Sequence, residues 1–388
     1  MLKSPEFKLL LSCASIVPSK NDLFSRDEAF SLGINEEEFL FWVKRHLVAP
    51  LVYLNLKSEK RISPNLLSQL KMTAEANQLK VLAAQSLQIK LQSFLDQKQI
   101  KGFFLKGLPL ADLYYGDIGL RHFMDIDIWV EEKYLDDLIH FLIELGYKSE
   151  IYFSDFNDTQ CSYIKFIDYH VHLRNNSALY PSIVEVHWKL RDRLGNFKFN
   201  PIKEYSKTIL VKNSIASLRV LDHYEQFIFL STHGAEHGWY RLKWLFDLPQ
   251  VLDKVSFDWT FMIKRAKELN ALEQVLLAFL VLNELTGFQI PEKIRWEISL
   301  RNFQFKLNYI KHLISYPGSY CDTDREKVLS FFYVLSQNRK GLFNKKLILK
   351  NMTSPNDWKL LPLPQRLFIL YFPLRPLLII WRRIFKKA

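Results

Sequence analysis

Two aspartates, Asp125 and Asp127, stand two positions apart in a segment that alternates polar and apolar residues over positions 125–130. Successive side chains of a β-strand point to opposite faces, so both carboxylates project from one face while Ile126 and Ile128 point into a core. Neighbouring carboxylates repel each other unless a cation lies between them. Mg²⁺ is a hard ion that takes carboxylate oxygens and leaves positions open for phosphate oxygens. The spacing therefore predicts a divalent-cation site.

A third carboxylate, Glu185, lies between Val184 and Val186 in a second segment with a strand-like pattern. Three acids that converge from two neighbouring strands are typical of a two-metal site that transfers phosphoryl or nucleotidyl groups. An Asp-x-Asp pair alone is also common on a solvated edge strand, which is the structural alternative. A nucleotide-sugar glycosyltransferase is another alternative, but it requires a βαβ nucleotide-binding half before the motif. Residues 1–100 have helical patterns there instead.

A Lys-Gly turn precedes the aspartates. Lys106 and Gly107 end a short apolar run and are followed by a segment that Pro109 opens as a helix. A helix N-terminus and a glycine that permits close approach suit a triphosphate, with Lys106 as a point charge on it. Arg121, four residues before Asp125, has the length to reach a phosphate or a departing pyrophosphate. The turn therefore predicts phosphate binding beside the cation site.

Three histidines are candidates for the same cleft. His233 and His237 stand four positions apart on a predicted helix, which is the spacing of a zinc-binding pair. No third ligand is evident from the sequence, so we favour structural histidines that pack beside Trp239 and Trp244. His170, His172 and His187 lie on predicted strands, and His187, two positions after the third carboxylate, is expected on the same face of its strand as that carboxylate. A structural role is the default interpretation for these three histidines.

The order and spacing of these motifs resemble those of a known family. The segments that carry the resemblance are Leu105-Lys-Gly107, Arg121, Asp125-Ile-Asp-Ile-Trp-Val130, Val184-Glu-Val-His-Trp188, residues 233–247, residues 357–364 and Leu374-Arg-Pro376. They are similar to the motifs of the polymerase-beta-like nucleotidyltransferase superfamily and, more narrowly, of the bacterial uncharacterised nucleotidyltransferase family. The resemblance covers most of the chain.

This resemblance implies a small mixed sheet and transfer of a nucleoside monophosphate from an NTP, with Mg²⁺ or Mn²⁺ as cofactor. It implies that Asp125 and Asp127 hold both metal ions. It implies that Glu185 binds the metal that activates the acceptor hydroxyl. The segment at 233–247 then faces the cleft.

The same resemblance makes His233, His237 and Arg241 candidates for contact with the nucleotide or the acceptor. One departure from the superfamily concerns the phosphate loop, which mostly contains Gly-Gly or Gly-Ser. Lys106-Gly107 has no serine beside it. A descendant that binds nucleotide without turnover, as a non-catalytic or membrane-recruited interaction module, therefore stays open as an alternative.

Periodicity predicts the elements that must position these residues. Apolar residues recur three and four apart in helices and alternate in strands. We expect helices at 36–48, 65–97, 109–115 and 134–145, strands at 102–105, 125–130, 161–173 and 183–190, and helices from about 220 almost to the end. The fold class is α+β. A small mixed-sheet nucleotidyltransferase core at 101–215 lies between helical regions at 1–100 and 216–350, and a basic apolar tail occupies 351–388.

The net charge is carried by the C-terminal end. The 388 residues include 53 Lys+Arg and 41 Asp+Glu, for a net charge of +12. Residues 327–388 contain thirteen of the basic residues and one acid, Asp357, and so account for the whole excess. A nucleic-acid-binding enzyme would more often spread basic residues around its cleft, so we do not expect nucleic acid as a partner. Cys13, Cys161 and Cys321 form no paired pattern, which indicates a reducing, cytoplasmic compartment.

An apolar run at 367–381 is interrupted by Pro373 and Pro376 and followed by basic residues at 382–387. It is too short and broken to cross a bilayer, which needs about twenty apolar residues. Trp381 and the flanking bases suit a segment that lies in the interface of an anionic membrane. Two interpretations stay open: a terminal helix packed on the core, or peripheral attachment to the inner face of the membrane.

The residues do not identify the acceptor hydroxyl. The tail favours an acceptor at the membrane, such as a glycan or a lipid-linked sugar in surface-polysaccharide assembly. A protein or peptide acceptor is the main alternative within the same class of enzyme.

Overall fold

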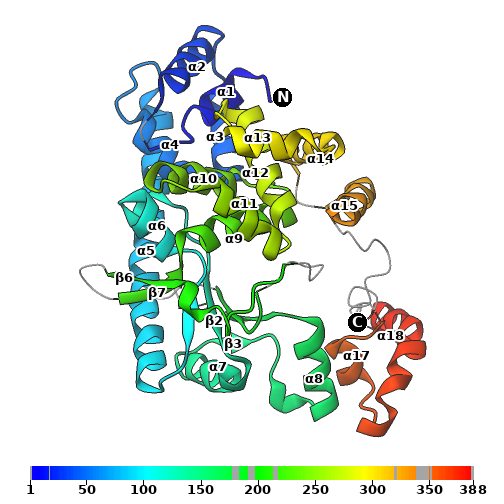
Figure 1. Cartoon of the computed structure of the whole chain (residues 1–388). Helices are drawn as coiled ribbons and strands as arrows, with labels where there is room; N and C mark the ends of the chain where they lie inside the picture. The colour runs from blue at the N-terminus through cyan, green and yellow to red at the C-terminus, as the bar shows by residue number, and fades with distance from the viewer. Residues whose placement is uncertain are drawn as a thin grey trace.

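A mixed β-sheet organises the chain (Figure 1). The computed structural model describes residues 2–16, 18–176, 183–190, 197–212, 217–318, 321–337, 349 and 352–385. Within these ranges seven strands pair in the order β3-β4-β5-β2-β1-β7-β6. Their bounds are Gly102–Phe104 (β1), Ile126–Val130 (β2), Lys148–Ser149 (β3), His170–Arg174 (β4), Ile183–His187 (β5), Thr208–Lys212 (β6) and Ser217–Leu221 (β7). The α+β class with a mixed sheet between helical regions is thus confirmed.

The register of the central strands brings polar residues into one row. β2 and β5 are parallel, and Asp127 lies opposite Glu185. β5 and β4 are antiparallel, and Glu185 lies opposite His172 while His187 lies opposite His170. Because directly paired residues project from the same face of a sheet, these side chains share one face.

The opposite face of the sheet is apolar. Ile126, Ile128, Val184 and Val186 alternate with the polar residues and are completely buried. They pack in one core with the long helix α5 (Pro64–Gln97) and with α7 (Leu135–Glu144). Ser63 caps α5, because its side chain accepts a hydrogen bond from the backbone N–H of Leu66. Burial of this face fixes which residues of each strand remain on the other.

The N-terminal helices and the helices that follow the sheet form one helical body, in the upper part of Figure 1. Gln250 donates a hydrogen bond to the carbonyl of Ala14 (2.8 Å), and Arg45 donates one to the carbonyl of Tyr240 (3.0 Å). Its helices are α1 (Pro5–Leu11), α2 (Lys20–Ser31), α3 (Glu36–His46), α4 (Ala49–Leu56), α9 (His223–Glu236), α10 (Leu242–Lys254), α11 (Trp259–Glu268), α12 (Leu272–Thr286), α13 (Glu292–Ser299), α14 (Gln304–Ser315) and α15 (Asp324–Gln337). Regions far apart in sequence therefore share one core.

The remaining helices connect the strands or end the chain. They are α6 (Leu108–Tyr115), α8 (Asp158–Ile167), α17 (Pro355–Leu360) and α18 (Tyr371–Phe385), with short 3₁₀ turns η1 (Ile118–Leu120), η2 (Glu132–Tyr134), η3 (Phe153–Asp155), η4 (Tyr205–Lys207) and η6 (Gln365–Leu370). The tail helices pack beside α8 (Figure 1). The Tyr163 ring of α8 lies 6.0 Å from Trp358 and 5.2 Å from Phe368, measured between ring centroids. One face of the tail is therefore packed on the core.

One local prediction was wrong, and one element was missed. We expected a strand at 161–173 because of its aromatic and β-branched residues. Instead, helix α8 extends to Ile167, and strand β4 begins only at His170. The reason is a capping box at Asn157 and Gln160, whose side chains satisfy each other's backbone N–H groups and start a helix. The hairpin of β6 and β7 was not expected.

The division into four regions stays a prediction. The sheet extends past residue 215, because β7 pairs in parallel with β1. The boundary placed at 215 falls between β6 and β7, outside the described residues.

Replacing Asp357 by Ala is expected to loosen the tail from the core. Asp357 is fully buried, accepts a hydrogen bond from the backbone N–H of Ser354 (2.8 Å), and pairs with Arg375 and Arg382. Its loss leaves two guanidinium groups without their counter-charge and removes a helix cap, which together cost about 2 kcal/mol. Limited proteolysis should cleave the variant near residue 355 faster than the wild type.

Lys359→Ala is the control, because the Lys359–Asp155 pair is half exposed. Equal cleavage of both variants would contradict the role of Asp357.

Candidate active site

The polar face of the sheet and helices α9 and α10 enclose a pocket of about 310 Å³. All the predicted site residues except Asp127 and Gly107 line it. Its lining residues are Lys106, Arg121, Met124, Asp125, Tyr169, His170, His172, Glu185, His187, Leu190, Phe197, Phe229, Thr232, His233, Glu236, His237, Tyr240, Arg241, Lys243 and Trp244. The fold thus brings together residues from the turn, the strands and the helical body.

Asp127 lies beneath the pocket on β2 and is 1% exposed. Its Oδ1 is 3.0 Å from Lys106 Nζ and 3.3 Å from His187 Nε2. Burial disfavours the charged carboxylate, but the nearby Lys106 and His187 hold the pKa of Asp127 well below its usual range. Asp127 Oδ2 is buried and accepts no hydrogen bond from the described residues. A buried carboxylate oxygen without a partner is suited to a cation.

Lys106 is the positive charge that pairs with Asp127. Burial disfavours its ammonium form, but the carboxylates of Asp127, Asp125 and Glu185 outweigh that effect and raise the pKa of Lys106. All three predicted acids therefore act on one side chain, although they come from two strands. Asp125 itself stands one residue before β2 and is half-buried at the pocket wall.

Gly107 explains the shape of the turn. Its φ of 78° and ψ of −134° belong to a region of backbone conformation that is essentially restricted to glycine. A Cβ at this position would lie 3.6 Å from the carbonyl oxygen of Asp125. The glycine therefore allows the chain to turn into α6 next to the aspartates, as the Lys-Gly pattern predicted.

Arg121 lines the pocket but is bound to the helical body. Its Nε and Nη2 donate to the two oxygens of Asp247 at 2.8 and 2.9 Å, and Tyr115 donates to the same carboxylate at 2.7 Å. The bidentate pair is buried. Two of the guanidinium nitrogens are therefore committed to a protein partner, and contact with a phosphate stays a prediction.

His233 and His237 have aromatic surroundings. Their rings lie 4.8 Å apart and 5.3 and 5.0 Å from the ring of Trp244, measured between centroids. Desolvation, with Lys106 and His237 nearby, lowers the pKa of His233 well below its usual range. Among the described residues neither histidine joins a metal-binding group of three. Packing beside Trp244 is therefore confirmed, and both rings also face the pocket.

Arg241 precedes α10 and lines the same wall. Its Nη1 lies 3.2 Å from the sulfur of Met124, next to the aspartates. Contact of Arg241, His187, His233 or His237 with a nucleotide stays a prediction.

Three pocket residues were missed as site residues. His170 and His172 were interpreted as structural histidines of a strand, and Lys243 was not considered, although it lies in the segment 233–247. The signal for the histidines was their alternation two positions apart, like that of the aspartates. Lys243 gives no local signal, because its burial depends on how α10 packs against the sheet.

Lys243 is buried in the pocket wall. Burial lowers the pKa of Lys243 to about 8, with Asp125 opposing this shift and Arg121 adding to it. At a pH near 8, about half of the Lys243 side chains are therefore neutral. The charge of Lys243 is thus sensitive to any anion that enters the pocket.

The acidic groups fit a divalent cation. Ligand atoms of Asp127, Glu185 and His187 lie within 4.8 Å of one another, and no described residue donates a hydrogen bond to the buried Asp127 Oδ2. Mg²⁺ takes carboxylate oxygens, and Mn²⁺ takes oxygen as well as imidazole nitrogen. The residues present thus agree with the cofactor that the motifs predict.

The fold combines a mixed sheet that carries acids on adjacent strands, a Lys-Gly turn beside these acids and a helical body over the pocket. The sequence matches the family model for uncharacterised nucleotidyltransferases over residues 33–287. Since this is more than half of the chain, the protein belongs to that family, and the family supports a general role in nucleotidyl transfer. A search among curated proteins finds no significant match.

Replacing Lys243 by Met is expected to stabilise the fold, most strongly below pH 8. Lys243 loses its proton near pH 8 when folded but only near pH 10.4 when unfolded, so the unfolded state binds more protons between these values. The cost of burying the charge therefore falls as the pH rises through this window. Urea unfolding should show a gain of about 2 kcal/mol at pH 7 that shrinks by pH 10.

Lys264→Met is the control for this prediction, because Lys264 is exposed on α11. A gain in unfolding free energy that does not change between pH 7 and pH 10, or that Lys264→Met reproduces, would contradict it.

Proposed function

We propose that the protein transfers a nucleoside monophosphate from an NTP to an acceptor hydroxyl and releases pyrophosphate, with Mg²⁺ or Mn²⁺ as cofactor. The observation that carries this proposal is the buried Asp127 carboxylate, opposite Glu185 in the strand register. One of its oxygens is paired with Lys106, and the other has no hydrogen-bond partner in the part of the chain that the structure describes. Asp125, Asp127 and Glu185 would hold the divalent metal, which would supply charge neutralisation at the α-phosphate and activation of the acceptor hydroxyl.

The protein's own groups position the reactants. Lys106 and Lys243 both line the pocket and carry the positive charge that a triphosphate requires. Gly107 allows the turn into α6 that places Lys106 at the pocket wall, because its φ of 78° suits glycine. The acceptor oxygen bonds to the α-phosphorus as the bond to the β-phosphate breaks, and pyrophosphate leaves with the electron pair. Glu185 would accept the hydroxyl proton, since it is a half-buried carboxylate that lines the pocket.

Replacing Asp125 by Asn is expected to reduce transfer at least about 100-fold, because a metal-binding charge is lost while the side-chain shape is kept. Asp125 is the first choice because it is half-buried, whereas Asp127→Asn also leaves Lys106 without its partner. The purified chain is incubated with each α-labelled NTP, Mg²⁺ or Mn²⁺ and membrane extract, and label on any acceptor is measured.

Asp137→Asn is the matched control, because Asp137 is exposed on α7 and away from the pocket. Equal transfer by the wild type and Asp125→Asn would contradict the assignment. Metal-dependent NTP binding without transfer would favour the alternative of a nucleotide-binding module. Failure of the wild type to bind any NTP would contradict the proposed function.

We further propose that the tail attaches the protein to an anionic membrane, where a lipid-linked or glycan acceptor would lie; a protein or peptide acceptor is the alternative. Leu377, Ile380 and Trp381 form a stripe along α18 and are 63%, 54% and 55% exposed. Arg366 and Lys359 are exposed nearby. Within the described residues no helix is long and apolar enough to span a bilayer.

The predicted basic cluster of the tail is smaller than the sequence count indicates. Arg375 and Arg382 pair with Asp357, so their charge is partly compensated within the tail. Lys386 and Lys387 lie outside the described residues. Attachment therefore depends on the apolar stripe as well as on charge.

Replacing Trp381 by Ser is expected to weaken binding to vesicles that contain phosphatidylglycerol about tenfold, because a large apolar side chain no longer enters the interface. Co-sedimentation at low and high salt measures this. Trp296→Ser is the control, since Trp296 is 68% exposed on α13. Wild-type protein that stays in solution at low salt, or equal losses for both variants, would contradict membrane attachment.

A further inference from the structure

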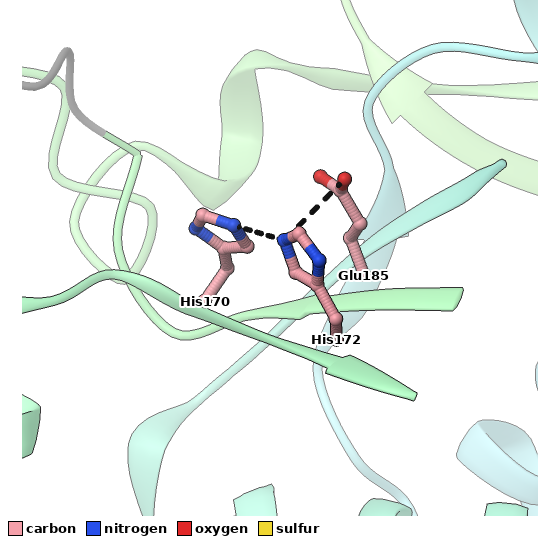
Figure 2. Close-up of side chains that lie close together, drawn as sticks. All are labelled: His170, His172 and Glu185. Atoms are coloured by element: carbon pink, nitrogen blue, oxygen red, sulfur yellow. Dashed lines mark hydrogen bonds and ion pairs between the residues drawn. The ribbon is translucent and has the colours of Figure 1, made fainter. Parts of the chain in front are cut away.

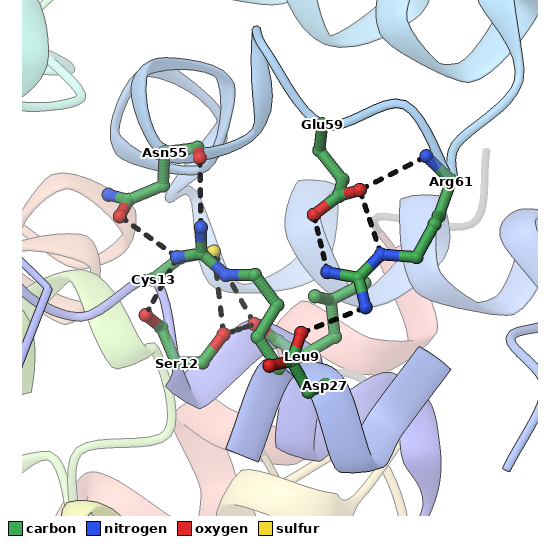
Figure 3. A network of polar contacts seen from close by, with 8 residues as sticks. Leu9, Ser12, Cys13, Asp27, Asn55, Glu59 and Arg61 are labelled. Carbon is green, nitrogen blue, oxygen red and sulfur yellow. Dashed lines mark hydrogen bonds and ion pairs between the residues drawn. The ribbon is translucent and has the colours of Figure 1, made fainter. Parts of the chain in front are cut away.

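A second cluster of metal-binding side chains lies beside the carboxylates, on strands β4 and β5 (Figure 2). His170 and His172 alternate on one face of β4, and Glu185 lies opposite His172 in the antiparallel register. His170 Nε2 is 2.7 Å from His172 Nε2, and His172 Nε2 is 3.6 Å from Glu185 Oε1. All three side chains are half-buried and line the pocket.

The spacing of these three atoms suits one metal ion. Bonds of about 2.0–2.2 Å from nitrogen and oxygen to a metal place neighbouring ligand atoms roughly 2.9–3.5 Å apart. The observed separations, a 2.7 Å hydrogen bond between the two imidazoles and 3.6 Å from His172 to Glu185, lie just outside the two ends of this range, and all three ligand atoms are within 4.8 Å of one another. Figure 2 shows the two imidazole nitrogens and the carboxylate directed toward one another.

Glu185 joins this cluster to the carboxylate site. Its Oε1 faces His172, whereas its Oε2 lies 3.5 Å from His187 Nε2 on the side of Asp127. A carboxylate with one oxygen toward each of two groups is arranged as a bridge between two cations. The row of paired strands β2, β5 and β4 therefore presents two adjacent ligand sets that share Glu185.

The ligand atoms of this cluster indicate which metal ions it can bind. Imidazole nitrogen is a ligand of Zn²⁺, Co²⁺ and Mn²⁺, whereas Mg²⁺ prefers a shell of oxygens. Three protein ligands at a pocket wall leave a position open for water or a substrate oxygen, as catalytic zinc sites do.

We propose that His170, His172 and Glu185 bind a first-row transition-metal ion, typified by Zn²⁺, at a position separate from that of the Mg²⁺ or Mn²⁺ held by the aspartates. This site does not rest on the proposed nucleotidyl transfer, because its ligands are complete without a nucleotide.

Titration of the chelator-treated full chain with Co²⁺, followed by visible absorption, tests the proposal without any measurement of transfer. The wild type is expected to bind about one equivalent and to develop the absorption bands of Co²⁺ with nitrogen ligands, and Zn²⁺ but not Mg²⁺ should displace it. His172→Gln should weaken Co²⁺ binding about tenfold or more, and His170→Gln should do the same. Zn²⁺ should raise the thermal midpoint of the wild type but not of these variants, which checks their folding in the same experiment.

His140→Gln is the matched control, because His140 is exposed on α7. Absence of Co²⁺ bands in the wild type, unchanged binding by His172→Gln and His170→Gln, or loss of binding in His237→Gln in their place would each overturn the proposal. Asp125→Asn should retain the Co²⁺ bands even if it abolishes transfer, so failure of this site and failure of the transferase proposal are distinguishable.

Discussion

The burial of the Asp127 charge is the constraint on which the site depends. A carboxylate that leaves water loses several kcal/mol of hydration unless charged partners replace it. Lys106 and His187 supply these partners from the turn after β1 and from β5. The turn, the two strands and the pocket floor are therefore held in one arrangement by a single side chain. Because Lys106 comes from the same turn as Gly107, the position of the predicted phosphate-binding loop follows from this pair.

A second buried charge pair fixes the opposite wall. Arg121 extends from the segment before β2 and holds Asp247 of α10 by two hydrogen bonds. This pair connects the sheet to the helical body, so α9 and α10 cover the polar face at a defined distance. Removal of one partner from such a pair leaves an uncompensated buried charge, which makes the arrangement rigid. Two nitrogens of Arg121 are bonded to Asp247, whereas Lys243 has a pKa of about 8 and changes its charge near neutral pH.

The sequence predicted the parts of the site that depend on local patterns. Alternation of Ile and Val with acids identified β2 and β5, because one face of a strand must be buried. The partnership of Glu185 with His172 could not be predicted, since it depends on the pairing of β4 with β5, which no local pattern encodes. For the same reason Lys243 was missed: a lysine beside Trp244 on a helix is usually solvated, and only the packed body buries it. Helix α8 was not predicted, because its aromatic and β-branched residues favour a strand, whereas the capping box at its start stabilises a helix.

The two walls of the pocket differ in charge, and this difference limits which ligands fit. The sheet wall presents Asp125 and Glu185 beside Lys106, whose charge is paired with Asp127, whereas the helical wall presents Arg241 and Lys243 together with Glu236. A simple anion would be repelled by the first wall, and a bare cation would gain nothing from the second. A ligand that brings both a divalent cation and phosphate groups satisfies both walls at once. The charges of the pocket therefore favour a metal-bound nucleotide over either component alone.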